Sequence, residues 1–232
     1  MRTTHPANAR RSVTASATRI VLGVGLAAAP ALVVPARADA APPLADPSVF
    51  VCEGKAATIV GTNGDDAIVG TKGADVIVSL GGNDLVRAGG GNDTICLGPG
   101  LDTAHAGSGD DVVRGGTGAD QLEGEAGIDL LVGDADGDSV DGGTGGDYLY
   151  GNDGSDWLIS RQGADLVYGG SGEDTIDASF DDDGSWDQVD GGSDDDLIFA
   201  DDGAAASDTV HGAGGTDDCW ADGIDLVFTC EP

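Results

Sequence analysis

The chain has 232 residues, of which 41 are glycine, and 42 Asp and Glu residues against 10 Lys and Arg residues give a formal net charge of -32. This charge repels nucleic-acid phosphates and anionic lipid surfaces, so we expect a cation as the partner and no nucleic acid. The glycine content and an aromatic content of 4% also argue against an ordinary globular enzyme core.

Residues 1–40 differ in composition from the rest of the chain. Several arginines precede an apolar run at residues 20–34, and small residues follow at 36–40. This order is typical of a secretory signal peptide. The run is shorter than the roughly 20 residues that cross a bilayer, and Pro30 interrupts it, so we expect no membrane span. The pair Arg10-Arg11 leaves the twin-arginine route open beside the general secretory route. We therefore expect a secreted, extracellular protein.

A repeat of nine residues begins at Gly61 and continues without a shift to Asp177. Asp fills the sixth place of every unit, the eighth place is always apolar, and Gly fills the fourth place of every unit except the one with Asp136. Such a fixed period predicts a solenoid in which each unit stacks on its neighbours. After residue 177 the Asp series continues at irregular spacing, with Asp187, Asp196, Asp208, Asp217 and Asp225.

The units resemble the RTX, or haemolysin-type, calcium-binding repeats. Residues 115–123, 142–150 and 169–177 read GGTGADQLE, GGTGGDYLY and GGSGEDTID, and each matches the consensus G-G-x-G-x-D-x-(apolar)-x in full. The resemblance covers residues 61–177 strictly and 178–228 loosely. It implies an all-β chain folded as a right-handed parallel β-roll, in which six residues of each unit form a turn and three form a strand. It also implies that two units complete one coil and that calcium ions lie between stacked turns.

The residue pattern favours the same fold independently. A strand of about three residues has room for one inward side chain, which the eighth place supplies, so we expect a core one residue thick per strand. Glycines at the first, second and fourth places allow a positive φ. With two units per coil, the sixth-place Asp residues stack in two columns, with neighbours about 4.8 Å apart. Like charges at that spacing repel by roughly 1 kcal/mol per pair even in water, so we expect folding to need a cation.

Calcium suits these columns best, because it accepts about 6 to 8 oxygen ligands from carboxylates and backbone carbonyls. Magnesium keeps its water, and zinc would need a cluster of His or Cys. We predict several calcium ions, bound by sixth-place carboxylates from turns two units apart and by carbonyls of the glycine-rich places. The predicted ligands are Asp66, Asp75, Asp84, Asp93, Asp102, Asp111, Asp120, Asp129, Asp138, Asp147, Asp156, Asp165 and Asp174, with Gly64, Gly73, Gly82, Gly91, Gly109, Gly118, Gly127, Gly145, Gly154 and Gly172.

The chain is expected to divide into five parts: a signal peptide at 1–40, an N-terminal segment and capping turn at 41–60, a regular roll at 61–177, irregular repeats at 178–228, and a tail at 229–232. Residues 52–60 keep the register but lack the Asp and Gly, which indicates a capping turn without ligands, with a linker as the alternative. Three units, with Pro99, Asp136 and Arg161 at unusual places, are expected to bind more weakly. The insertions at 181–184 and 201–207 are expected to be solvated loops.

Four cysteines in an exported chain favour two disulfides over metal ligation. Bridged Cα atoms must lie within about 7 Å, and more than a dozen units separate Cys96 from Cys219 along a roll. We therefore expect Cys52 to pair with Cys96 and Cys219 with Cys230. The first pair requires the residues before Ala56 to leave the roll and run along it.

The expected function is calcium binding by a non-catalytic structural protein, whose folding is coupled to calcium outside the cell. Carboxylate pairs occur throughout the chain and mark no active site, and His105 and His211 occupy ninth places, which are predicted to face outward. Two alternatives stay open. One is a calcium-dependent adhesin or extracellular matrix component with a cell-surface or matrix partner. The other is a glycan-active enzyme that uses a carboxylate pair on the face of the roll.

Overall fold

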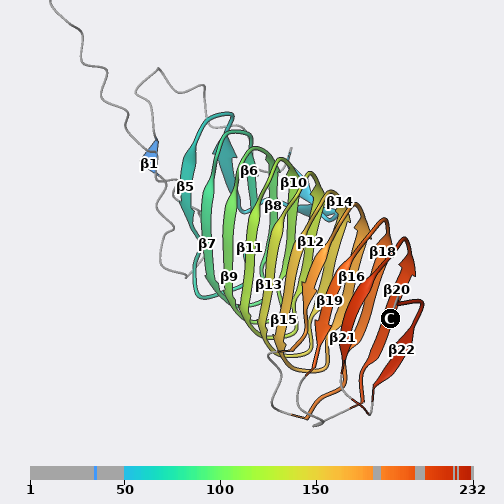
Figure 1. The fold of residues 1–232 in the computed structure, drawn as a ribbon. Coiled ribbons are helices and arrows are strands. Elements are labelled where there is room, and N and C mark those ends of the chain that lie inside the picture. The colour runs from blue at the N-terminus through green and yellow to red at the C-terminus, as the bar shows by residue number, and fades with distance from the viewer. Residues whose placement is uncertain are drawn as a thin grey trace, which may run out of the picture.

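The computed structural model describes residues 34–35, 50–179, 184–201, 207–221, 223 and 225–230. These residues form strands and turns, and among them there is no helix that could cross a membrane. The chain winds as a flattened spiral whose strands alternate between two ten-stranded sheets (Figure 1). We call these the odd-strand sheet and the even-strand sheet. The predicted all-β fold and parallel β-roll are confirmed.

Neighbouring strands within each sheet are parallel, except that β1 pairs antiparallel with β5. The odd-strand sheet runs in the order β1 (Val34–Pro35), β5 (Asp66–Val69), β7 (Leu85–Gly90), β9 (Thr103–Ser108), β11 (Gln121–Ala126), β13 (Ser139–Thr144), β15 (Trp157–Gln162), β17 (Thr175–Asp177), β19 (Leu197–Ala200) and β21 (Asp218–Ala221). The even-strand sheet runs in the order β22 (Leu226–Phe228), β20 (Thr209–Gly214), β18 (Gln188–Ser193), β16 (Leu166–Ser171), β14 (Tyr148–Asp153), β12 (Leu130–Ala135), β10 (Val112–Thr117), β8 (Thr94–Pro99), β6 (Val76–Leu80) and β4 (Ile59–Thr62).

The register of the sheets shows that two units make one coil. Val113 in β10 aligns with Ile95 in β8 on one side and with Leu131 in β12 on the other, each one coil of 18 residues away in sequence. Side chains at the same place of alternate units therefore lie in rows that run along the roll. Residues that occur 18 positions apart in the sequence therefore lie on neighbouring strands of the same sheet.

The expected strand length of three residues is wrong for most of the roll. Strands β7 to β16, β18 and β20 each span six residues, from the seventh place of one unit to the third place of the next. Because side chains alternate across a strand, two of them face inward, at the eighth and the first places. In β7 these are Val86 and Ala88, both fully buried. The expected core of one residue per strand is therefore also wrong. The sequence did not indicate the second residue, because first places hold mainly Gly, Ala or Ser, which give no apolar pattern.

The core is one continuous cluster of buried side chains from both sheets, and it runs along the roll from Ile59 to Val210. Each regular unit adds one eighth-place side chain, and the first place adds a small residue or none. One coil reverses this arrangement, because Leu97 fills a first place while the next eighth place holds only Ala104. Both residues are fully buried, so the large and small residues exchange places while the core stays filled.

Positive φ angles occur at the second and fourth places and not at the first. The second place keeps this conformation even without glycine, as at Glu125 (φ 71°) and Arg161 (φ 72°), and the fourth place does so at Asp136 (φ 74°). The stacking of coils therefore determines the backbone there. The expectation of a positive φ at first-place glycines is wrong. Those glycines are required for space, as described below.

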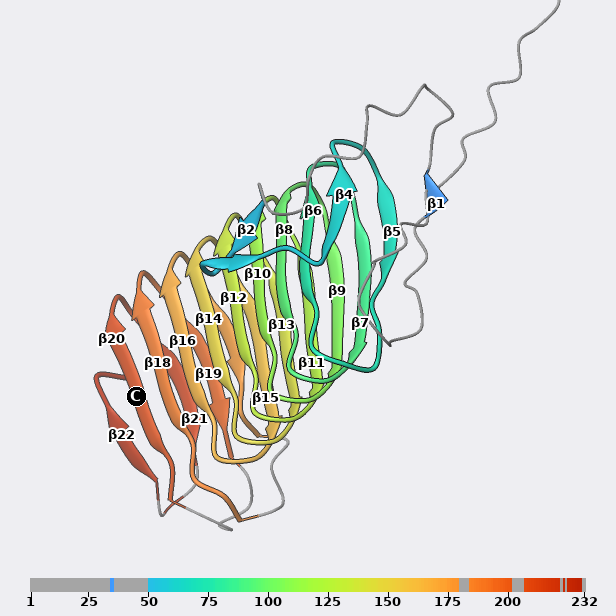
Figure 2. The same cartoon turned by 180° about the vertical axis from the view of Figure 1, so that it is seen from behind.

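Residues 51–56 leave the roll and form an antiparallel hairpin of β2 (Val51–Cys52) and β3 (Lys55–Ala56), which lies across the even-strand sheet near β8 and β10 (Figure 2). The predicted disulfide between Cys52 and Cys96 joins this hairpin to β8, with Cα atoms 5.8 Å apart. Lys55 Nζ donates a hydrogen bond to Oγ1 of Thr94 at 2.8 Å, and Nη1 of Arg114 donates one to Glu53 at 3.1 Å. Residues of the predicted capping turn thus pack on a sheet face.

The roll continues through the irregular region. Strands β18 to β22 extend both sheets, and Val210 in β20 still aligns with Val189 in β18. The second predicted disulfide, between Cys219 and Cys230, joins β21 to the chain after β22, with Cα atoms 5.8 Å apart. Most of the two predicted insertion loops, at 181–183 and 202–206, lies outside the described residues, as do residues 231–232 of the tail, residues 41–49 and, apart from β1, the predicted signal peptide.

Candidate metal centre

The sixth-place Asp side chains stack in two columns, one at the start of the strands of each sheet. In both columns the backbone N–H of one Asp donates a hydrogen bond to Oδ1 of the Asp one coil later, at distances of 2.6 to 3.1 Å. The first column contains Asp66, Asp84, Asp102, Asp120, Asp138, Asp156, Asp174, Asp196 and Asp217. The second contains Asp75, Asp93, Asp111, Asp129, Asp147, Asp165, Asp187, Asp208 and Asp225.

The second oxygen of most of these carboxylates is buried without a partner. This applies to Oδ2 of Asp84, Asp93, Asp102, Asp111, Asp120, Asp129, Asp138, Asp147, Asp156, Asp174, Asp196 and Asp217. Leaving a buried charged oxygen unsatisfied costs more than leaving a neutral one. Two rows of such oxygens therefore require either protons or a cation inside the described part of the roll.

In most units the first place is glycine, and this glycine leaves space beside the Asp oxygen. A Cβ on Gly115 would lie 2.6 Å from Oδ2 of Asp120 and 2.6 Å from the carbonyl oxygen of Gly133, one coil later. A Cβ on Gly142 would lie 2.7 Å from Oδ2 of Asp147 and 2.8 Å from the carbonyl oxygen of Ser160. A carboxylate oxygen and a carbonyl oxygen thus border the same small space in successive coils. Calcium takes this mixture of oxygen ligands, so the residues present fit the ion.

The surroundings oppose ionisation of the carboxylates when no cation is bound. Burial, which is the main cause, raises the pKa of Asp147 to about 8; the neighbouring Asp165 and Asp129 raise it further, and the hydrogen bond from the backbone of Asp129 acts against them. Burial likewise raises the pKa to about 7 or about 6 in most of the others. The value is about 7 for Asp84, Asp93, Asp129, Asp138 and Asp174, and about 6 for Asp102, Asp111, Asp120 and Asp196.

The fourth-place glycines predicted as ligands lie in the turns between strands. In most turns a Cβ at this place would meet the backbone of the fourth place one coil earlier. On Gly109, for example, it would overlap the carbonyl group of Gly91. Gly64 and Gly73, at the N-terminal end, have open space instead. In these turns the fourth-place carbonyl groups therefore lie against the fourth place of the next coil.

The unusual units keep their Asp residues in the columns. Asp138 and Asp165 make the same hydrogen bonds as their neighbours, although Asp136 and Arg161 precede them. Asp136 replaces glycine at the fourth place, and its Oδ2 accepts a hydrogen bond from the backbone of Gly118. The structure thus gives no reason to separate these two units from the rest.

Four further Asp residues share the buried environment of the predicted ligands, and a fifth, Asp225, accepts the same hydrogen bond from a half-buried position. They belong to the irregular region and were not counted among the predicted ligands, namely Asp187, Asp196, Asp208, Asp217 and Asp225. The signal that identifies them is their place before an apolar eighth-place residue, which the insertions leave unchanged.

A family comparison agrees with this geometry. The model of the RTX calcium-binding nonapeptide repeat matches the chain in four copies, at residues 60–95, 98–131, 132–167 and 150–185. The chain belongs to this RTX family. Its repeats are calcium-binding and form a structural β-roll. No curated protein matches the chain.

Proposed function

We propose that this RTX protein is a secreted, non-catalytic calcium-binding roll whose folding is coupled to calcium. The observation that carries the proposal is the set of buried Oδ2 atoms without partners in the two Asp columns. Each of these carboxylates already uses Oδ1 to hold the backbone of the preceding coil. In the units whose first place is glycine, the remaining oxygen faces the space that this glycine leaves open, where a cation would satisfy it.

Calcium supplies positive charge and accepts several oxygen ligands in flexible geometry. The residues that would hold it are the sixth-place Asp residues of both columns, with carbonyl oxygens of the glycine-rich places. The chain itself fixes the spacing of the coils through the ladder of bonds from backbone N–H to Oδ1. In the folded roll this ladder holds the carboxylates in place, whereas their mutual repulsion opposes folding when no ion is bound.

The coupling of folding to calcium follows from the small size of the apolar core. Each unit of nine residues buries one large apolar side chain, so hydrophobic burial per ordered residue is small. The columns add like charges in a region where water is excluded. Binding an ion only in the folded state shifts the folding equilibrium by mass action. We therefore propose that the roll is unfolded where calcium is scarce and folds where calcium is abundant.

Two disulfides support an extracellular location, because such bonds persist in oxidising compartments. We propose that residues 1–40 are a cleaved leader and that residues 61–228 act as one continuous roll. In this arrangement the hairpin at 51–56 strengthens the first coils, and the Cys219–Cys230 disulfide holds the last ones.

A calcium titration of the full chain with both disulfides oxidised tests the coupling. Far-UV circular dichroism is recorded from chelator upward, with magnesium as the comparison ion. We expect a cooperative gain of β signal with calcium and little gain with magnesium. A complete β spectrum in chelator at neutral pH would contradict the coupling, and a disordered spectrum in saturating calcium would contradict the roll itself.

A matched pair of variants tests whether the columns are the site. Asp174→Asn keeps an oxygen that can accept the hydrogen bond from Asp156 but removes the charge from the buried position. Glu173→Gln removes one charge from the adjacent, exposed residue. We expect Asp174→Asn to raise the calcium midpoint several times more than Glu173→Gln. Equal shifts would mean that overall charge matters and the column does not.

A further inference from the structure

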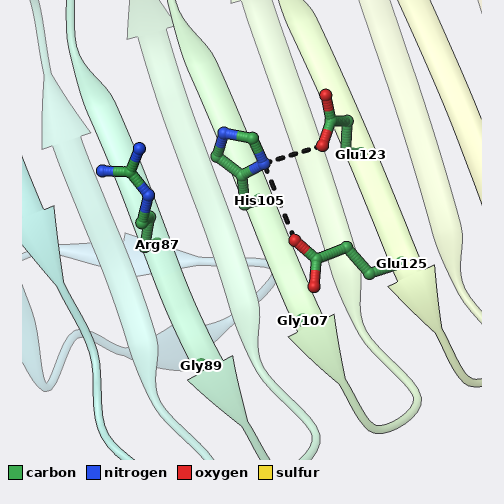
Figure 3. Close-up of a pocket in the computed structure, with 6 residues that line it drawn as sticks. All are labelled: Arg87, Gly89, His105, Gly107, Glu123 and Glu125. Atoms are coloured by element: carbon green, nitrogen blue, oxygen red, sulfur yellow. Dashed lines mark hydrogen bonds and ion pairs between the residues drawn. The ribbon is translucent and has the colours of Figure 1, made fainter.

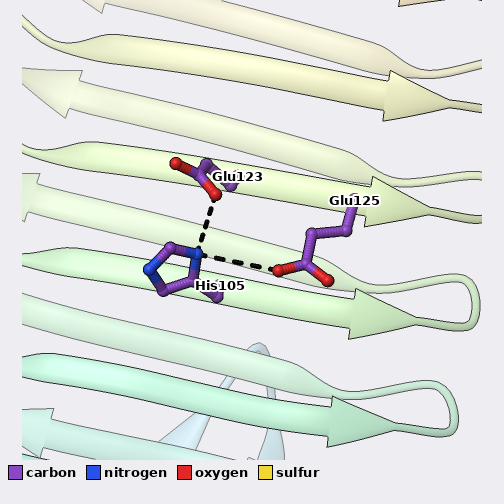
Figure 4. A group of neighbouring side chains, drawn as sticks. All are labelled: His105, Glu123 and Glu125. Carbon is purple, nitrogen blue, oxygen red and sulfur yellow. Dashed lines mark hydrogen bonds and ion pairs between the residues drawn. The ribbon is translucent and has the colours of Figure 1, made fainter.

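A second group of metal-binding side chains lies on the outer face of the odd-strand sheet, away from the Asp columns. His105 belongs to β9, and Glu123 and Glu125 belong to β11, the next strand of that sheet (Figure 4). Nδ1 of His105 lies 2.7 Å from Oε2 of Glu123 and 3.7 Å from Oε1 of Glu125. One ligand atom from each of the three residues lies within 4.8 Å of the other two.

The sheet holds these three residues in fixed positions. His105 is aligned with Glu123, and Gly107 is aligned with Glu125, in the parallel register of β9 and β11. Both strands have neighbours on each side, so their backbones are fixed by the ladder of hydrogen bonds. The donors are thus arranged by strands and not by a loop, and little ordering would be needed when an ion binds.

The side chains border an open hollow of about 420 Å³ (Figure 3). Gly89 and Gly107 form part of its lining and contribute no side chain, which leaves room for an ion and its water. Arg87 lies beside His105, and the two carboxylates lie on the other side of the ring. The nearby acidic side chain of Asp141 already pairs with Arg161, whose Nε and Nη2 donate hydrogen bonds of 2.5 and 2.6 Å to its two oxygens, so it is not counted among the donors.

The donor set differs from that of the columns. One imidazole nitrogen and two carboxylates provide too few oxygens for calcium, which takes about 6 to 8. Zinc and related ions take three such protein ligands plus water, at about 2.0 to 2.2 Å in tetrahedral sites. Donor atoms in a tetrahedral site with those bond lengths lie about 3.3 Å apart. The two distances from Nδ1 of His105, 2.7 and 3.7 Å, fall on either side of this separation.

We propose that His105, Glu123 and Glu125 bind one divalent transition-metal ion with the preferences of Zn²⁺, at a site separate from the calcium columns. The ion replaces the contacts between the ring nitrogen and the two carboxylates and joins β9 to β11 on the outer face. Its remaining coordination position faces the hollow and holds water. This proposal does not rest on calcium-coupled folding, because the group is defined by strand register.

Titration with Co²⁺ in excess calcium tests the site on the full chain with both disulfides oxidised. Co²⁺ replaces Zn²⁺ and absorbs visible light strongly when its coordination is tetrahedral. We expect one equivalent to produce this absorption and one equivalent of Zn²⁺ to remove it. Absence of the tetrahedral absorption, or an equal loss of it on adding more calcium instead of Zn²⁺, would overturn the proposal.

Variants identify the ligands. His105→Asn is expected to weaken Co²⁺ binding by about 100-fold, and Glu123→Gln and Glu125→Gln by about 10-fold each, because each loses one of three protein ligands. His211→Asn is the matched control, since the ring of His211 stacks on Phe228 with centroids 4.7 Å apart and lies on the other sheet. His5→Asn controls for the remaining histidine.

The substituted side chains at the proposed site are only partly buried or exposed, so the fold is expected to persist, and the β signal in calcium verifies this for each variant. Unchanged binding in His105→Asn, or equal losses in His105→Asn and His211→Asn, would overturn the assignment. If a variant loses its β signal, Zn²⁺ protection of His105 in the unsubstituted chain against diethyl pyrocarbonate decides the question. Protection of His105 but not of His211 supports the site, and equal modification contradicts it.

Discussion

The backbone N–H of Asp129 donates a hydrogen bond to Oδ1 of Asp147 at 2.9 Å, while Oδ2 of Asp147 is buried without a partner. The two oxygens of one carboxylate thus have different roles. Oδ1 sets the spacing between coils by accepting this hydrogen bond, and Oδ2 needs a nearby positive charge when the carboxyl group is ionised. The same residue therefore makes the roll regular and, when its carboxyl group is ionised, leaves a buried charged oxygen without a partner.

Acid is expected to stabilise the metal-free roll. Burial raises the pKa of Asp129 from 3.8 to about 7 and that of Asp147 to about 8. The folded chain then holds protons that the unfolded chain releases, so stability is fully present below about pH 4 and is lost as the pH rises through about 6 to 8. Far-UV circular dichroism of metal-free protein between pH 4 and 8 should show the β signal decreasing as pH increases. A signal that increases with pH would contradict this.

With calcium present, the pH dependence is expected to run in the opposite direction, with calcium binding favoured at higher pH. Protons and calcium compete for the same carboxylates, so the calcium midpoint should rise as the pH falls below about 7. Titrations at several pH values measure this shift. Glu173→Gln is the control and should leave the pH dependence unchanged, because Glu173 lies outside the columns. A calcium midpoint that does not vary with pH would separate the ion from these carboxylates.

Gly115→Ala is expected to displace the carboxylate of Asp120 from its position in the first Asp column. The added Cβ would lie 2.6 Å from Oδ2 of Asp120, so the carboxylate would have to move from the space assigned to calcium. Overpacking of this kind costs about 1 to 3 kcal/mol of the free energy of unfolding. Gly81→Ala is the control, because its Cβ would meet only Pro99, at 3.5 Å or more. Urea unfolding in saturating calcium measures the difference, and equal losses would show that the first place has no special role.

The register of the roll could be predicted because the period of nine converts sequence spacing into stacking. Asp residues 18 positions apart had to share a column, and His105 and Glu123, also 18 apart, had to lie side by side. The strand length could not be predicted in the same way. First-place residues such as Ala88 and Gly115 are small, so their burial leaves no apolar signal.

The part played by the second place was also hidden in the sequence. The repeat indicates a turn there, whereas the structure continues the strand to the third place and projects Glu125 over the same hollow as His105. The sequence also could not predict that each Oδ1 accepts a hydrogen bond from the backbone N–H of the Asp one coil earlier. A carboxylate at the sixth place satisfies the pattern whichever of its oxygens faces the backbone, and only the packing of the coils decides between them.

Leu149→Ala is expected to cost about 2 to 5 kcal/mol of the free energy of unfolding in calcium, as for other fully buried leucines. Each strand contributes only one large side chain to the core here, so few neighbouring side chains can move into the cavity. Ile128→Ala is the control, because its side chain is 55% exposed and its loss should change stability by about 0.5 kcal/mol or less. Urea unfolding measures both variants, and a loss for Leu149→Ala as small as the control's would mean that apolar packing contributes little beside the metal.

Removing the Cys52–Cys96 disulfide with paired serines is expected to destabilise the calcium-loaded roll more than removing Cys219–Cys230. The first bond closes a separation of 44 residues and the second a separation of 11. Loop-closure entropy then favours the first by about 1 kcal/mol. The loss of Cys52–Cys96 also leaves the hairpin at 51–56 held only by contacts such as Lys55 to Thr94, on a partly exposed surface. Thermal unfolding in calcium compares the two double variants. A larger loss for Cys219–Cys230 would show that the last coils, and not the first, limit the stability of the roll.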